Sequence, residues 1–71
     1  MKLTDAQRKV LERMRDGETF DLIDLVKLLK VPAVRELRSN EYITQTPRSI
    51  WDRWYTVYTI TPAGIAALEE G

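Results

Sequence analysis

The chain has 71 residues, of which 44% are hydrophobic and 31% are charged, and eleven Lys and Arg balance eleven Asp and Glu. This length predicts one domain, residues 1–71, that buries only about 60% of the surface exposed by its unfolded form. The zero net charge excludes a global field that would draw the whole molecule to DNA or to an anionic membrane. Cysteine and histidine are absent, which excludes disulfides, thiolate zinc sites and histidine-dependent catalysis.

The residue inventory also argues against an enzyme. Only Ser39 and Ser49 offer serine hydroxyls, no histidine can activate them, and no glycine-rich phosphate loop is present. We therefore predict no catalytic residue, no metal site and no cofactor. No apolar run approaches the roughly 18–20 residues that span a bilayer, and residues 1–17 lack the apolar core of a signal peptide. These features predict a cytoplasmic protein without a membrane partner.

The first predicted helix begins after Thr4 and ends before Gly17. Thr4 and Gln7 have the spacing of a capping box, in which each residue satisfies a backbone N–H of the other. Gly17 stands where a left-handed C-terminal cap is expected. Residues 19–20 are predicted to form a short extended link.

The second predicted helix covers residues 22–29 and starts at the capping residue Asp21. Its apolar residues follow the helical repeat at Leu22, Leu25, Val26 and Leu29. Ile23 and Leu28 lie partly outside that stripe, so the helix is apolar over more than one face. We expect this helix at the centre of the core.

The third predicted helix is short and covers residues 32–40, with Pro32 in its first turn. Ala33, Val34 and Leu37 can pack inward. Asn40 is expected to take the left-handed conformation that ends the helix. The side chains predicted to share its outer face are Arg35, Arg38 and Ser39.

The apolar period then changes from 3.6 to 2, which predicts a β-hairpin. Residues 42–46 and 54–60 read as its strands and residues 47–53 as its tip. In the second strand Trp54 shares a face with Tyr58 and Ile60, so we expect Trp54 to be buried, whereas Tyr55 and Val57 lie on the outer face. A last helix begins at residue 62, after the capping residue Thr61.

These assignments together predict one hydrophobic core. Its members are expected to be Leu3, Val10, Leu11, Met14, Phe20, Leu22, Leu25, Val26, Leu29, Val34, Leu37, Ile43, Tyr58, Ile60, Ile65 and Leu68.

The order helix, short strand, helix, helix, hairpin, helix resembles the winged helix-turn-helix family. Residues 25–31 (LVKLLKV) are similar to the first helix and turn of its bihelical motif, with Lys30 where glycine is frequent. Residues 37–43 (LRSNEYI) resemble the exit from the recognition helix, with Glu41 where glycine is usual, and residues 58–64 (YTITPAG) resemble the second wing strand and last helix of MarR- and PadR-type regulators. The resemblance implies an α+β fold with a three-helix core, a β-hairpin wing and a short C-terminal helix. It also implies DNA binding and transcription regulation, and the small size suggests a phage-related protein.

The charges are unevenly distributed along the chain. Residues 27–53 hold six basic and three acidic side chains, a net of +3, and they include the segments that contact DNA in winged helices. The predicted recognition helix has only about two turns. We expect DNA contacts from Lys30, Arg35, Arg38, Ser39, Arg48, Trp51 and Arg53. An alternative is that Arg35 and Arg38 pair with Glu36, Glu41 or a neighbouring helix.

A second function remains open, in which the chain docks on a protein and binds no DNA. The zero net charge, the short third helix and the two Trp residues of the predicted wing favour it. Trp51 is expected to be exposed at the hairpin tip, although one or both Trp side chains could also fold back onto the third helix. We expect a monomer or a weak homodimer, whose contact would use Ala63, Ile65, Ala66 and Ala67.

Overall fold

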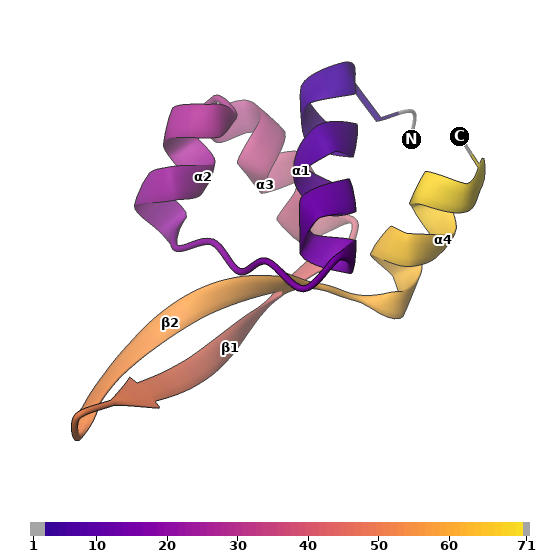
Figure 1. Ribbon diagram of the computed structural model, residues 1–71. Helices are drawn as coiled ribbons and strands as arrows, with labels where there is room; N and C mark the ends of the chain where they lie inside the picture. The colour runs from indigo at the N-terminus through magenta and orange to yellow at the C-terminus, as the bar shows by residue number, and fades with distance from the viewer. Residues whose placement is uncertain (1–2, 71) are drawn as a thin grey trace.

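The computed structural model describes residues 3–70, which form four helices and one antiparallel β-hairpin (Figure 1). The expected α+β class is therefore confirmed. The elements follow in the order α1 (Asp5–Arg15), α2 (Leu22–Leu28), α3 (Val31–Ser39), β1 (Ile43–Ile50), β2 (Arg53–Ile60) and α4 (Pro62–Glu70). Figure 1 shows α1, α2 and α3 grouped together, with α4 beside α1, while the far end of the hairpin projects away from all four helices.

The starts of α1, α2 and α4 are fixed by side chains that accept hydrogen bonds from N–H groups of the first turn. The Thr4 hydroxyl accepts a hydrogen bond from the Gln7 N–H, and the Gln7 side chain accepts one from the Thr4 N–H, so the predicted capping box is confirmed. Asp21 caps α2 by accepting from the Asp24 N–H, and the Thr61 hydroxyl caps α4 by accepting from the Gly64 N–H. All three capping residues were predicted from the sequence, and the structure confirms them.

A left-handed residue follows each of the helices α1 and α3. Gly17 has φ +106° after α1, as predicted. After α3 the left-handed residue is Glu41, with φ +59°, whereas Asn40 has φ −87°. The prediction for Asn40 was therefore wrong by one residue. The Asn40 side chain instead donates a hydrogen bond to the Glu36 carbonyl, which secures the last turn of α3.

One fully buried leucine from each of α1, α2 and α3 forms the centre of the core. These residues are Leu11, Leu25 and Leu37. The remaining buried hydrophobic residues are Leu3, Val10, Met14, Phe20, Leu29, Val34, Ile43, Val57, Tyr58 and Leu68. Most of the predicted core is thus confirmed, but Ile60 and Ile65 are only half-buried.

The prediction that α2 lies at the centre of the core was wrong in part. Leu25 and, just after the helix, Leu29 are buried, but Leu22 and Val26 remain 47% and 39% exposed. The reason is that a helix of seven residues has room for only one buried face, and no element within residues 3–70 covers the side on which Leu22 and Val26 lie. Ile23 and Leu28 are exposed as well.

The hairpin is longer and its turn tighter than the sequence pattern indicated. β1 pairs with β2 in a register that runs from Ile43 opposite Ile60 to Ile50 opposite Arg53, so the predicted tip, residues 47–53, is mostly paired strand. Only Trp51 and Asp52 form the loop, both with positive φ (54° and 64°). Positive φ at both central residues meets the requirement of a type I′ turn, whose twist suits a hairpin.

The base of the hairpin is fastened to the helices by the link that follows α1. Phe20 and Tyr58 form a β-bridge, in which the Tyr58 N–H donates to the Phe20 carbonyl at 2.7 Å. In this bridge the backbone groups of Tyr58 point away from β1, so those of Gln45, which lies opposite Tyr58, point away from β2. Because backbone direction alternates along a strand, the nitrogen of Pro47 also points away from β2, and its missing N–H costs no hydrogen bond. The predicted extended link at residues 19–20 therefore serves as a minimal third strand.

The link itself is held by Arg13. Its guanidinium donates two hydrogen bonds to the Glu18 carboxylate, at 3.1 and 2.8 Å, and lies 4.9 Å above the Phe20 ring. The hydrogen bond to Glu18 raises the pKa of Arg13 above its ordinary value. The contact orients the chain between α1 and the Phe20–Tyr58 bridge.

Candidate nucleic-acid interface

The exposed face of α3 carries two arginines that no acidic partner neutralises. Arg35 and Arg38 are one helical turn apart and both are exposed. Within residues 3–70 neither forms an ion pair, so the alternative in which they pair with Glu36 or Glu41 is not what the structure shows. The Glu36 carboxylate instead accepts a hydrogen bond from Gln7, on the α1 side of the helix.

Arg38 extends toward the base of the hairpin. Its guanidinium carbon lies 5.9 Å from the centroid of the Tyr58 ring, within the range of a cation–π contact. This contact orients the side chain while leaving its N–H groups available to an acceptor such as phosphate or a guanine edge. Ser39 is exposed beside it at the end of α3.

Lys30 occupies the N-cap position of α3 and is also exposed. Its side chain makes no capping hydrogen bond, and a cation at a helix N-terminus is electrostatically unfavourable. An anion placed there would be attracted mainly by the ammonium group, because Pro32 has no N–H and the Ala33 N–H already donates to the Lys30 carbonyl.

The far end of the hairpin divides the predicted wing residues between its two faces. The register puts Arg48 opposite Tyr55 and Ile50 opposite Arg53, and these four side chains share one face. Trp54 lies on the other face, opposite Ser49. We call residues 48–55 the hairpin end.

Both tryptophans of the hairpin end are exposed. Trp51 is 92% exposed in the turn, as predicted, but Trp54 is 73% exposed, so the prediction of a buried Trp54 was wrong. The face assignment was correct, since Trp54 and the buried Tyr58 lie on the same side of β2. Trp54 lies outside the core because it stands next to the turn, four residues further from the helices than Tyr58. Val57 was expected on the outer face but is buried, which means that both faces of the hairpin are covered at its base.

The structure thus arranges the predicted DNA-contacting residues as two separate groups. Lys30, Arg35, Arg38 and Ser39 lie on or next to α3, whereas Arg48, Trp51 and Arg53 lie at the hairpin end. An eight-residue strand extends for about 25 Å, and the whole molecule measures 39 × 22 × 18 Å. The two groups therefore lie at opposite ends of a long, exposed hairpin rather than in one patch.

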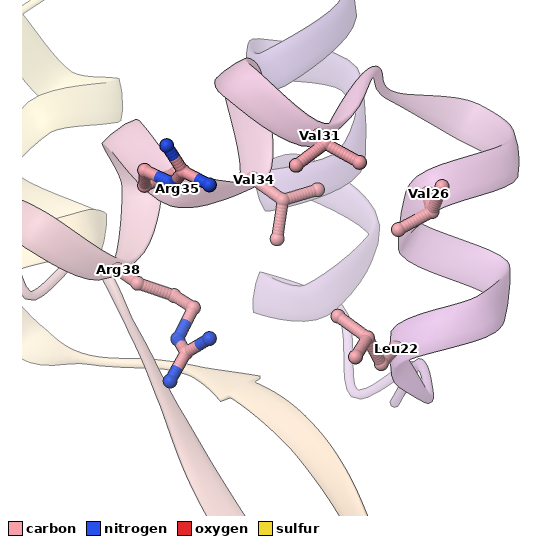
Figure 2. A pocket seen from close by; sticks show the side chains of 6 residues that line it. All are labelled: Leu22, Val26, Val31, Val34, Arg35 and Arg38. Carbon is pink, nitrogen blue, oxygen red and sulfur yellow. The ribbon is translucent and has the colours of Figure 1, made fainter.

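A shallow groove between α2 and α3 was not predicted from sequence. It has a volume of about 200 Å³ and is lined by Leu22, Val26, Val31, Val34, Arg35 and Arg38. Figure 2 shows the four apolar side chains turned into the space between the helices, with both arginines along one side. The signal available in the sequence was the excess of apolar residues on α2, which the core could not accommodate.

Other kinds of site find no support in the described part of the chain. Residues 3–70 contain no group of three or more acidic side chains placed to hold a metal ion. In the same residues, no helix is both long enough and apolar enough to cross a membrane. The α4 residues predicted for self-association differ in exposure: Ala63 and Ala66 are exposed, Ile65 is half-buried and Ala67 packs against the core.

Comparisons with known proteins identified no relative: no family model, no curated protein and no solved structure matches this chain.

Proposed function

We propose that this chain is a small DNA-binding module of the winged-helix type, acting in transcription regulation. In this proposal α2 and α3 form the helix-turn-helix unit, the hairpin is the wing, and α3 enters the major groove. The element order, the Phe20–Tyr58 bridge and the projecting hairpin support the fold part of the proposal.

One observation carries the DNA-binding part: Arg35 and Arg38 are exposed on α3 and have no acidic partner within residues 3–70. Guanidinium groups bind phosphate oxygens and the O6 and N7 atoms of guanine through paired N–H donors. α3 has nine residues and is about 13 Å long, so only its first two turns would contact base edges. The hairpin would place Arg48 and Arg53 on a neighbouring stretch of the phosphate backbone.

A titration with duplex DNA, followed on backbone amide shifts at low and at physiological salt, tests the proposal. We expect salt-sensitive shifts confined to residues 30–39 and 48–54, because phosphate contacts release counterions from DNA. The double variant R35E/R38E should lose most of the affinity, and a wing variant R53E should reduce the salt slope by about 1. K9E, a charge reversal on the exposed surface of α1, is the matched control and should bind as the parent does.

The exposure of Trp51 and Trp54 beside Ile50 favours a second candidate function, docking of the hairpin end on a protein. Exposed aromatic residues of this size are frequent at the centres of protein interfaces. The absence of amide shifts with duplex DNA at any salt concentration would favour docking over DNA binding.

A further inference from the structure

The groove between α2 and α3 combines an apolar floor with charge of one sign only. Leu22, Val26 and Val31 keep 47%, 39% and 49% of their surface exposed, and Val34 closes the floor. Branched apolar side chains exposed side by side on two adjacent helices are costly in water unless something covers them.

The two charged residues of the groove determine what kind of molecule can cover it. Arg35 and Arg38 are its only charged lining residues, and both lack an acidic partner within residues 3–70. The neighbouring Glu36 does not neutralise them, because its carboxylate accepts a hydrogen bond from the Gln7 side chain of α1. The occupant that matches this surface therefore carries apolar side chains next to carboxylates.

The dimensions favour a side chain over a free small molecule. At about 200 Å³ the groove is smaller than the roughly 300–1,000 Å³ of typical ligand pockets, and Leu22 and Val26 on its α2 side remain partly exposed. Such a groove can accept one or two side chains of a longer chain that lies along the helices. Amphipathic helices dock in grooves of this type through residues spaced three or four apart.

A second hollow, between α1 and α2, is less suited to the same role. It is lined by Ala6, Lys9, Val10, Arg13 and Leu28. Its Arg13 is already bound to Glu18, so that one of its two cations is neutralised. The α2–α3 groove instead combines three exposed branched apolar side chains with two arginines that no acidic residue within residues 3–70 neutralises.

We propose that the α2–α3 groove binds an acidic amphipathic segment of a partner protein. Apolar side chains of the segment insert between Val26, Val31 and Val34, and its carboxylates accept hydrogen bonds from Arg35 and Arg38. This inference goes beyond DNA binding and does not depend on it. Because both functions would use Arg35 and Arg38, a bound segment would exclude DNA from α3.

The probe for this proposal is a capped synthetic peptide of about 12 residues, built from Leu and Glu so that its Leu side chains recur at helical spacing. Added to the full chain, it should shift the amides of Val26, Val31, Arg35 and Arg38. R35E/R38E should weaken binding by at least about tenfold and should gain affinity for the matching Leu/Lys peptide. V26S should weaken binding of the Leu/Glu peptide without changing its salt dependence. K9E should leave it unchanged.

Three results would overturn the proposal: no amide shifts with the Leu/Glu peptide, equal binding of the Leu/Lys peptide by the parent chain, or an equal loss in K9E. Thermal unfolding followed by circular dichroism shows whether each variant is folded. Binding of the Leu/Lys peptide by R35E/R38E shows in addition that the apolar part of the groove is intact in this variant. V26S separates peptide binding from DNA binding, because this variant removes no cation and should bind duplex DNA as the parent does. Failure with peptide therefore leaves the DNA proposal standing, and failure with DNA leaves this one standing.

Discussion

The side-chain amide of Gln7 on α1 donates a hydrogen bond to the carboxylate of Glu36 on α3, at 3.2 Å. The same nitrogen donates to the Ala33 carbonyl at 3.1 Å, and the amide oxygen accepts from the Thr4 N–H. Gln7 is fully buried, yet both its N–H groups and its oxygen are bonded. One residue thus caps α1, joins α1 to α3, and holds Glu36 away from the arginines of the exposed face.

Replacing Gln7 by Leu should lower the free energy of unfolding by about 1–3 kcal/mol, because the Thr4 N–H loses its partner and the link to α3 is removed. Urea unfolding measures this change. Q7E adds a second test, since it places a carboxylate against that of Glu36 and raises the pKa of at least one of the pair in the folded state. A raised pKa means that the folded state binds the extra proton more readily, so Q7E should recover stability as the pH falls toward about 4. A Q7E deficit that is independent of pH would contradict the Gln7–Glu36 contact.

Gly64 is a position where α4 lies close to Tyr42 and Ile60. A Cβ at this position would lie 2.7 Å from Cγ1 of Ile60 and would also clash with the carbonyl oxygen of Tyr42. Gly64→Ala should therefore destabilise the protein by about 1–3 kcal/mol, although Ala is ordinarily the better helix former by about 1 kcal/mol. Ala66→Gly, at an exposed position of α4, is the control and should cost about 1 kcal/mol. A higher melting temperature for Gly64→Ala would show that α4 packs differently.

Local signals in the sequence were sufficient to predict the helices, because α1, α2 and α4 each begin at a side-chain cap and α3 has Pro32 in its first turn. Thr4, Asp21 and Thr61 all bind the N–H group three residues later. The left-handed position after α3 was not predictable from propensity alone, since Asn tolerates this conformation better than Glu. Glu41 adopts it because the Tyr42 N–H must reach the Leu37 carbonyl to close the turn.

Burial was harder to predict than secondary structure, because periodicity defines a face but not what covers it. On α2 the helical repeat grouped Leu22 and Val26 with Leu25 and Leu29, but only the last two reach the core. The α2–α3 groove is the consequence, so it could not be identified before the helix packing was known. The cations of the candidate interface were identified from sequence, whereas their separation into two groups depends on the length of the hairpin.

Trp54 illustrates the same difficulty along a strand. Its face was predicted correctly, but its distance from the helices followed from a turn placed at residues 51–52. We expect Trp54→Ala to change the free energy of unfolding by less than about 0.5 kcal/mol, whereas Tyr58→Ala, on the same face but buried, should cost roughly 3–5 kcal/mol or unfold the chain. Emission from both tryptophans should be red-shifted and readily quenched by iodide. Blue-shifted, protected emission would show that the hairpin end folds back onto the helices.

The turn at Trp51 and Asp52 imposes a conformational cost that falls mainly on Trp51. Both residues have positive φ, a region that Gly, Asn and Asp tolerate and that costs a bulky residue such as Trp about 1–3 kcal/mol. Replacing the pair by Asn-Gly (W51N/D52G) should therefore raise the free energy of unfolding, by about 1 kcal/mol in thermal or urea unfolding. A strained turn that keeps a 92% exposed indole is expected where the side chain has a role in binding.

The same variant then separates stability from function. If Trp51 contacts DNA, as the sequence predicts, W51N/D52G should bind duplex DNA more weakly than the parent while it gains stability. Trp51→Ala serves as the control, because it removes the indole but retains Asp52 and so should reproduce the loss of binding without the full gain in stability. A W51N/D52G protein that is more stable and binds duplex DNA as tightly as the parent would show that Trp51 contributes nothing to DNA binding. A less stable variant would show instead that the turn is not of type I′, since Asn-Gly is the pair that this turn favours most.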